Sequence, residues 1–175
     1  AGSLHWDTLR LFHEMKQGLL KTVQNYEGNI AAIGTDTWGV DFGLLDKRGN
    51  LLGNPYHYRD ARTENMIDEA AKVVEKRNIY QETGIEFQPF NTLYQLLAMK
   101  KFNPEILNNA QTMLFIPDLF NYFLTGEKHA EYTISSTSQM LDANNKNWNI
   151  KLLEKLGLPT KLLPEIVAAG TINGR

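Results

Sequence analysis

The sequence predicts an α/β fold, with a mixed sheet that includes a hairpin and a helix-rich C-terminal half. Three observations predict it. The first third of the chain passes from a helical period to a short apolar run and then to a turn-rich stretch. Beyond Pro55, apolar residues at helical spacing dominate. The 175 residues are 42% hydrophobic and contain no linker rich in Pro, Gly or Ser, so they can bury one core as a single domain.

The first third contains a helix, a strand and a hairpin. Apolar residues recur at three- and four-residue steps over residues 7–27, and Asp7 is placed to cap this helix. Residues 30–34 form a wholly apolar run, which predicts a strand covered on both faces. Asp, Gly and Asn cluster at residues 46–50 between two apolar runs and predict a hairpin turn.

Helices make up most of the remainder. Asp60 can cap a second helix, because the apolar positions of residues 66–74 keep helical spacing. Residues 113–116 are apolar and predict another strand. Further helices are predicted before Thr83-Gly84, over residues 91–101, from Pro104, over residues 117–125 and over residues 150–156.

Composition excludes several classes of function. The chain has no cysteine, which rules out thiolate catalysis, cysteine-ligated zinc and iron–sulfur clusters. Its 18 Lys and Arg against 20 Asp and Glu give a net charge of -2, without a basic footprint for nucleic acid or a membrane. Uninterrupted aliphatic runs reach four residues, against the roughly 20 that a spanning helix needs. We therefore expect a cytoplasmic protein with neither a nucleic-acid nor a membrane partner.

Common nucleotide and metal motifs are missing. The sequence contains no P-loop, no G-x-G-x-x-G fingerprint, no H-E-x-x-H zinc motif and no EF-hand loop. Its four histidines are scattered without metal-ligand spacing. We therefore expect no metal site among these residues.

The most informative block is Gly34-Thr-Asp-Thr-Trp-Gly-Val-Asp41, where the predicted strand meets the hairpin. Sheets of α/β proteins bind ligands at such strand ends. Gly39 would let a ligand approach the backbone, Trp38 offers a flat face for a sugar ring, and Asp41 can accept hydrogen bonds from hydroxyls. The alternative is that Asp36 and Asp41 cap turns and that Trp38 packs in the core.

Two further blocks have both a structural and a functional interpretation. Residues 58–63 form a charged cluster at a predicted helix start, which suits capping and ion pairing. Tyr58 and Arg59 could instead edge a cleft for a polar substrate. Residues 88–92 open another helix, where Asn and Thr are ordinary capping residues.

Several sequence blocks follow one another in order over essentially the whole chain: Ile33-Gly-Thr-Asp-Thr-Trp-Gly-Val-Asp-Phe42, Tyr58-Arg-Asp-Ala-Arg-Thr63, Thr83-Gly-Ile-Glu-Phe-Gln-Pro-Phe-Asn-Thr-Leu-Tyr-Gln-Leu96, Pro117-Asp118, Leu124-Thr-Gly-Glu127 and Glu131-Tyr-Thr133. Together they resemble the FGGY carbohydrate kinases. The first and third blocks resemble the rhamnulokinase branch in particular.

The resemblance implies a ribonuclease H-like/actin-like ATPase domain. Such kinases have two domains of this type facing each other across a cleft. With Mg²⁺, they transfer the γ-phosphoryl group of ATP to a ketose hydroxyl, here the 1-hydroxyl of L-rhamnulose. The parent enzyme would use ATP and Mg²⁺, and we expect neither to be bound to these residues.

The resemblance also implies which residues contact the sugar. Gly39 stands where the family contacts the sugar through a glycine, and Trp38 and Asp41 would line the same pocket. Tyr58 and Phe90 stand where the glycerol-kinase branch has a tryptophan and a tyrosine facing its polyol. The general family signature expects a lysine and a tryptophan at two further positions, where this chain has Gln95 and Ala98.

By the same resemblance, residues 1–175 are a partial N-terminal kinase domain, the sugar-binding half, without the first strand hairpin of the family. The catalytic base of the family is an aspartate preceded by a histidine, and no His-Asp pair occurs in this sequence. We expect this aspartate to lie beyond residue 175 and the second, ATP-binding domain to be absent. The isolated chain is then expected to be inactive, with no catalytic residue of its own.

Three alternatives remain open at this point. One is another FGGY ketose kinase, acting on L-fuculose or xylulose. The second is a ribonuclease H-like nuclease, in which Asp36, Asp41 and Asp46 would bind two divalent ions. The third is a stand-alone sugar-binding or interaction domain without catalysis.

Overall fold

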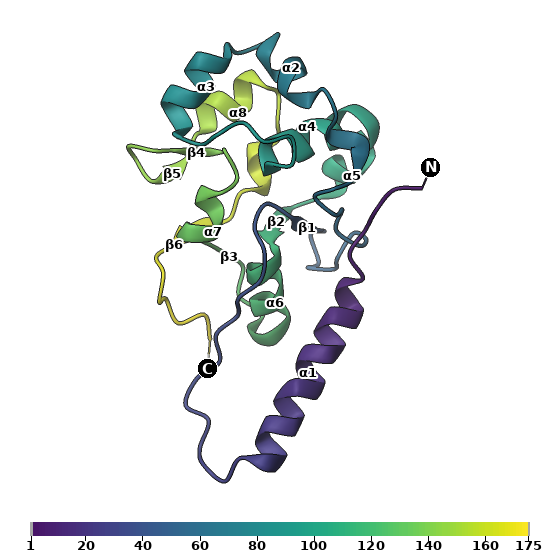
Figure 1. The fold of residues 1–175 in the computed structure, drawn as a ribbon, viewed down its shortest axis with the longest axis vertical. Helices are drawn as coiled ribbons and strands as arrows, with labels where there is room; N and C mark the ends of the chain where they lie inside the picture. Colours follow the sequence, from purple (N-terminus) through teal and green to yellow (C-terminus); the bar gives the residue numbers. More distant parts are fainter. Residues whose placement is uncertain (1, 175) are drawn as a thin grey trace.

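The structure is a computed structural model that describes residues 2–174. In Figure 1, α1 runs along one side of the molecule, the helices α2, α3, α4, α5 and α8 gather at the opposite end, and α6 lies in between. The helices span Thr8–Asn25 (α1), Met66–Ala71 (α2), Lys76–Thr83 (α3), Thr92–Phe102 (α4), Pro104–Asn109 (α5), Ile116–Thr125 (α6), Tyr132–Ser136 (α7) and Ile150–Lys155 (α8).

Most helix ends follow from the local sequence. The carboxylate of Asp7 accepts a hydrogen bond from the Arg10 backbone N–H at 3.1 Å and so caps α1, as predicted. Gly84 and Gly126 end α3 and α6 in the left-handed conformation, with φ of 68° and 83°. Pro104 opens α5 in its first turn. None of the helices within residues 2–174 combines the length and apolarity required to span a bilayer.

The strands form three pairs. β1 (Phe42–Leu45) lies antiparallel to β2 (Thr112–Phe115), with Phe42 opposite Phe115. β3 (His129–Glu131) lies parallel to β6 (Glu165–Val167), and β4 (Leu141–Asp142) lies antiparallel to β5 (Asn147–Trp148). Parallel and antiparallel pairing therefore occur together in an α/β fold, as predicted, although the strands are divided among three two-stranded sheets.

The predicted hairpin turn follows β1. The backbone N–H of Asp46 donates to the carbonyl of Asn50 at 2.9 Å, and Leu45 forms a bridge with Leu51. The segment after the turn pairs with β1 only through this bridge, whereas all four residues of β1 pair with β2.

The prediction of a buried strand at residues 30–34 is wrong. This segment has no regular secondary structure, and Ile30 and Ile33 are 42% and 56% exposed. The physical reason is that an apolar run becomes a covered strand only beside a partner, and no strand of residues 2–174 pairs with it.

The helix predicted after Asp60 is also interrupted. Asp60 caps a short 3₁₀ turn, Ala61–Thr63, by accepting from the Arg62 backbone N–H. Asn65 then adopts a positive φ of 65°, which breaks the helical path before α2 begins.

The core surrounds the β1–β2 pair on both faces. Phe42, Phe115 and Met113 pack with α4 and α8 in the main cluster, while Leu45 and Leu114 pack with Leu119 of α6. Gly43 permits the close approach of α6, because a Cβ there would lie 2.8 Å from Leu119 Cδ2. This sandwiched pair is the rigid base from which the candidate site begins.

Candidate functional site

The candidate site is built on a strained turn just before β1. The Asp41 backbone N–H donates to the Gly39 carbonyl at 2.8 Å, which makes residues 39–41 a γ-turn. Its central residue, Val40, has a φ of 66°, a conformation that is rare and costly for a β-branched side chain. Strain of this kind persists only where surrounding contacts hold it, and it is concentrated at functional sites.

Asp41 lies beneath the surface rather than at it. Its side chain is 0% exposed. Oδ2 accepts hydrogen bonds from the indole N–H groups of Trp6 and Trp38, at 2.7 and 3.0 Å, and from the Tyr58 backbone N–H at 3.1 Å. Oδ1 accepts from Gln95 Nε2 at 2.8 Å. Asp41 is therefore joined directly to two of the candidate sugar residues, Trp38 and Tyr58.

Five rings form a continuous row over this buried carboxylate, and we call them the aromatic row: Trp38, Trp6, His57, Tyr58 and Phe90. Neighbouring ring centroids are 4.2 Å apart between Trp38 and Trp6, 4.2 Å between Trp6 and His57, 4.5 Å between His57 and Tyr58, and 6.0 Å between Tyr58 and Phe90. All five residues are half-buried. The row thus combines fixed ring positions with partly accessible faces.

An open groove of about 570 Å³ lies beside the Trp38 end of the aromatic row. Its walls come from α1, from residues 34–38 and from Phe120 on α6. Gly39, next in sequence, is half-buried, and a Cβ there would lie 3.3 Å from Thr137 Oγ1. A side chain at Gly39 would therefore crowd Thr137, and glycine lets these two segments pack closely.

The structure thus brings all five sequence-predicted residues together. Gly39 and Asp41 belong to one turn, and Trp38 just before it and Tyr58 are both joined to it by hydrogen bonds to Asp41. Phe90 joins through its edge-on contact with Tyr58, with an interplanar angle of 73°. The chemistry available here is stacking and backbone hydrogen bonding, both suited to a polyhydroxylated ring.

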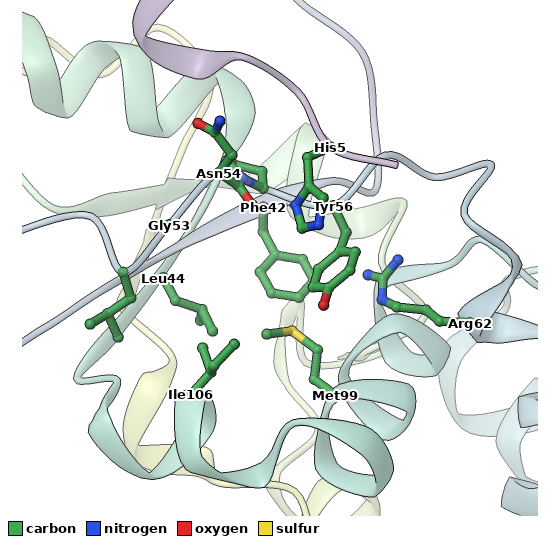
Figure 2. A pocket seen from close by; sticks show the side chains of 11 residues that line it. His5, Phe42, Leu44, Gly53, Asn54, Tyr56, Arg62, Met99 and Ile106 are labelled. Atoms are coloured by element: carbon green, nitrogen blue, oxygen red, sulfur yellow. Dashed lines mark hydrogen bonds between the residues drawn. The ribbon is translucent and has the colours of Figure 1, made fainter. Parts of the chain in front are cut away.

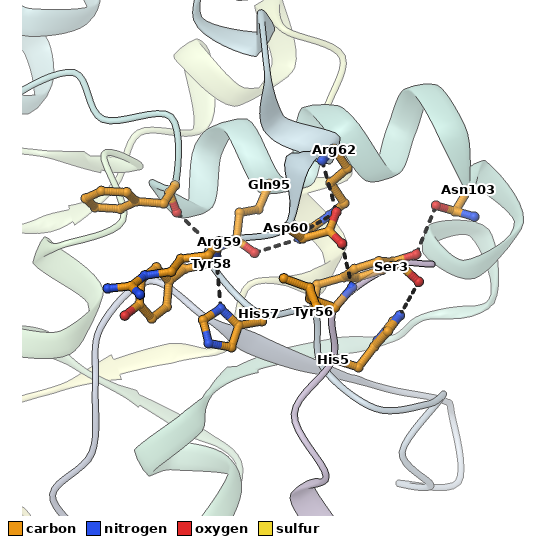
Figure 3. Close-up of polar contacts among 12 residues, drawn as sticks. Ser3, His5, Tyr56, His57, Tyr58, Arg59, Asp60, Arg62, Gln95 and Asn103 are labelled. Carbon is orange, nitrogen blue, oxygen red and sulfur yellow. Dashed lines mark hydrogen bonds and ion pairs between the residues drawn. The ribbon is translucent and has the colours of Figure 1, made fainter. Parts of the chain in front are cut away.

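Sequence reasoning missed two residues of this arrangement, Trp6 and His57. It also missed the hydrogen bond between Gln95 and Arg62. Gln95 Oε1 accepts from Arg62 Nη2 at 2.7 Å, and the two side chains lie close together in Figure 3. Trp6 lies 35 residues from Asp41 in the sequence, so no local spacing reveals the contact. The one available signal was Gln95, which departs from the family signature.

A partly open cavity of about 120 Å³ lies between the residues that follow β1 and the helices α4 and α5. Figure 2 shows apolar side chains, such as Phe42, Met99 and Ile106, around it and the Arg62 guanidinium beside Tyr56. Burial lowers the pKa of Arg62 to about 10, and Nε and Nη1 have no hydrogen-bond partner. Two buried carboxylates, Asp60 and Asp41, already balance this one cation, so the cavity is a poor site for an anion.

The carboxylates of the nuclease alternative do not converge. Asp41 is occupied by its four donors, as described above. The Asp46 carboxylate accepts hydrogen bonds from the backbone N–H groups of Arg48 and Asn50 and from the Asn50 side chain, and these bonds lower the pKa of Asp46. Asp46 therefore stabilises the hairpin turn in which it lies. Asp36 is exposed. Across residues 2–174, no three His, Asp or Glu side chains are grouped closely enough to hold a metal ion.

Comparison with known sequences supports a kinase relationship. The chain is 43% identical over 173 residues to the rhamnulokinase of Enterococcus faecalis, covering 99% of this chain and 34% of the relative. It is 41% identical over 169 residues to the rhamnulokinase of Oceanobacillus iheyensis, covering 97% of this chain and 36% of the relative. The chain therefore spans about a third of the length of these curated relatives.

Solved structures share the fold. A ligand-bound xylulose kinase from Lactobacillus acidophilus superposes with a TM-score of 0.87 at 24% identity, over 95% of this chain and 34% of that one. A Plasmodium falciparum glycerol kinase with ADP gives a TM-score of 0.84 at 22% identity, over 97% of this chain and 36% of that one. These similarities concern the fold and confirm the expected actin-like ATPase class.

The sequence also matches one protein family from its first residue to its last. Residues 1–175 match the N-terminal domain of the FGGY carbohydrate kinases. Full coverage by this match, with relatives above 40% identity over nearly the whole chain, leaves no segment outside the similarity. This chain belongs to the FGGY family of carbohydrate kinases.

Proposed function

We propose that this chain is the sugar-binding N-terminal domain of a kinase that transfers the γ-phosphoryl group of ATP to the 1-hydroxyl of L-rhamnulose. The observation that carries the proposal is the aromatic row next to Gly39, assembled over one buried carboxylate. The similarity to rhamnulokinases supports the choice of sugar.

Each site residue has a distinct role in this proposal. Trp38, Tyr58 and Phe90 offer ring faces to the C–H surface of the sugar. Gly39 exposes backbone groups to the sugar hydroxyls. Asp41 acts from beneath, because its oxygens are taken up by Trp6, Trp38, Tyr58 and Gln95.

ATP and Mg²⁺ would supply the phosphoryl group and neutralise its charge in the parent enzyme. Within residues 2–174, no three His, Asp or Glu side chains are grouped to hold a metal ion, and we propose neither role for these residues. The task that we propose for this chain is to hold and orient the acceptor sugar. Phosphoryl transfer also needs a base at the nucleophile, and the sequence contains no His-Asp pair.

Calorimetric titration with L-rhamnulose, L-fuculose and xylulose tests the proposal. We expect L-rhamnulose to bind tightest, and Gly39→Ala to weaken its binding by about tenfold, because the added methyl group would press on Thr137 and shift the backbone beside Trp38. Gly18→Ala is the matched control, since Gly18 lies within α1 and a Cβ there meets nothing within 4 Å. Tighter binding of L-fuculose or xylulose would transfer the assignment to that sugar.

The proposal also predicts that the chain by itself does not phosphorylate L-rhamnulose. ADP release in a coupled assay should equal the protein-free blank. Sustained turnover above the blank would show that residues 1–175 contain a base and a phosphate site, and it would contradict the division of roles proposed here.

A further inference from the structure

The buried side chain of Gln95 contacts three parts of the candidate sugar site. Gln95 lies on α4 and is 1% exposed. Its Nε2 donates to Asp41 Oδ1 at 2.8 Å, to the Phe90 carbonyl at 2.9 Å and, at a longer 3.3 Å, to the Val40 carbonyl. It therefore contacts the strained turn, the carboxylate below Trp38 and Tyr58, and the backbone that carries the Phe90 ring.

The amide of Gln95 can point only one way. Its Oε1 accepts from Arg62 Nη2 at 2.7 Å, and a guanidinium only donates hydrogen bonds. Its Nε2 faces a carboxylate and backbone carbonyls, which only accept. A reversed amide would place N–H against N–H and oxygen against oxygen. Arg62 thus fixes the direction in which Gln95 donates.

The strained turn needs such a support. Val40 has a φ of 66°, and its carbonyl accepts from Thr92 Oγ1 at 2.7 Å as well as from Gln95. Both donors come from the first turns of α4, so this helix start holds the turn in its rare conformation. Without these donors, the peptide could relax toward negative φ and carry Trp38 and Asp41 with it.

We propose that Gln95 is a positioning residue of the sugar site: through Asp41 and the Val40 carbonyl it sets the Trp38 indole and the Tyr58 backbone, and through the Phe90 carbonyl it sets the third ring. The proposal rests on the proposed sugar-binding function. Gln95 itself touches no sugar. A purely structural role would instead make Gln95 one more buried amide in the core.

Gln95→Glu separates these two roles. The side chain keeps its size and its acceptor for Arg62, but at about pH 8 a carboxylate faces Asp41 where an N–H donor stood. Burial and like-charge contact with Asp41 raise the pKa of the new carboxyl, against the lowering by Arg62, so a fall to about pH 5 favours the protonated form, which can donate to Asp41 again. The charged and titratable groups around it are Asp41, Asp60, Arg62, His57 and Tyr58, and the wild-type chain at both pH values controls for them.

The measurements are L-rhamnulose affinity and the indole N–H resonance of Trp38, with that of Trp148 as internal reference. We expect Gln95→Glu to weaken affinity by about tenfold or more at the higher pH and to recover most of it at the lower one. The Trp38 resonance should shift and return in parallel. The matched control is Gln139→Leu, which removes a buried amide bonded to Ile85 and Asn91 rather than to Asp41.

The measured affinities and the Trp38 resonance decide between the two roles. The positioning role is supported if Gln95→Glu loses L-rhamnulose affinity at the higher pH and regains it at the lower pH, while Gln139→Leu changes the affinity little. The positioning role is overturned if Gln95→Glu leaves the affinity unchanged. It is also overturned if both variants lose affinity equally and Gln95→Glu does not regain it at the lower pH. If the wild-type chain binds no sugar, the proposed function fails, and the Trp38 resonance alone decides: a reversible shift supports positioning by Gln95, and a constant resonance overturns it.

Discussion

At the scale of single residues, Asp36 and Asp41 look equivalent in the sequence but differ sharply in the structure. Asp36 is exposed, whereas Asp41 is 0% exposed and accepts four N–H donors. We predict that Asp41→Asn lowers the free energy of unfolding by about 2 kcal/mol or more, because its new amide turns an N–H toward a buried donor. Asp36→Asn should stay within about 0.5 kcal/mol. Urea unfolding measures both, and equal effects would refute the buried position of Asp41.

Asp118, in the first turn of α6, is the buried carboxyl with the clearest pH signature. Burial raises its pKa from 3.8 to about 7, although the Glu131 backbone N–H donates to it weakly. A pKa raised on folding means that the folded state holds the proton more tightly. The stability that this proton contributes is therefore lost as the pH rises from about 4 through about 7.

Asp118→Asn should abolish this loss. The variant should match the wild type near about pH 4 and exceed its stability near about pH 8, by at most about 4 kcal/mol, since each pKa unit corresponds to about 1.4 kcal/mol. Thermal unfolding across this range provides the measurement. Asp68→Asn is the control, because a hydrogen bond from Lys76 lowers the pKa of Asp68 and no gain at high pH is expected. A difference independent of pH would contradict the account.

At the scale of elements, the apolar residues 30–34 can be tested for a contribution to core packing. Ile33 is 56% exposed, whereas Ile79 on α3 is 0% exposed. Ile33→Ala should cost under about 0.5 kcal/mol of unfolding free energy, and Ile79→Ala should cost about 2–5 kcal/mol. Comparable costs in chemical denaturation would mean that the run is packed as a strand.

Elements with local signals could be predicted, and elements that depend on distant contacts could not. The Asp7 cap, the Gly84 and Gly126 stops and the Pro104 start each act within one helical turn, and all were found where the sequence placed them. Residues 30–34 carry a strand composition, but pairing with another segment decides whether a strand forms.

The same distinction holds for the site. Trp38, Gly39 and Asp41 are neighbours in the chain, so their shared location was predictable. The contacts of Asp41 with Trp6 and Gln95 cross 35 and 54 residues, and no periodicity encodes them. The positive φ of Val40 was equally hidden, because a valine gives no warning of a turn that usually favours glycine.

At the scale of the whole molecule, the site joins four separate stretches of chain over one buried carboxylate. The N-terminal segment contributes Trp6, the segment before the γ-turn contributes Trp38, the loop after Tyr56 contributes Tyr58, and α4 contributes Gln95. Because each stretch is fixed by the same carboxylate, the aromatic row should respond to a ligand as one unit.

The three tryptophans allow that claim to be tested in one experiment. Trp6 and Trp38 donate their indole N–H groups to Asp41, whereas Trp148 donates to the Pro164 carbonyl. In a titration of the ¹⁵N-labelled chain with L-rhamnulose, the account predicts saturable shifts of the Trp6 and Trp38 indole resonances while Trp148 stays constant. Constant Trp6 and Trp38 resonances at saturating sugar, or equal shifts of all three, would contradict a sugar site on the aromatic row.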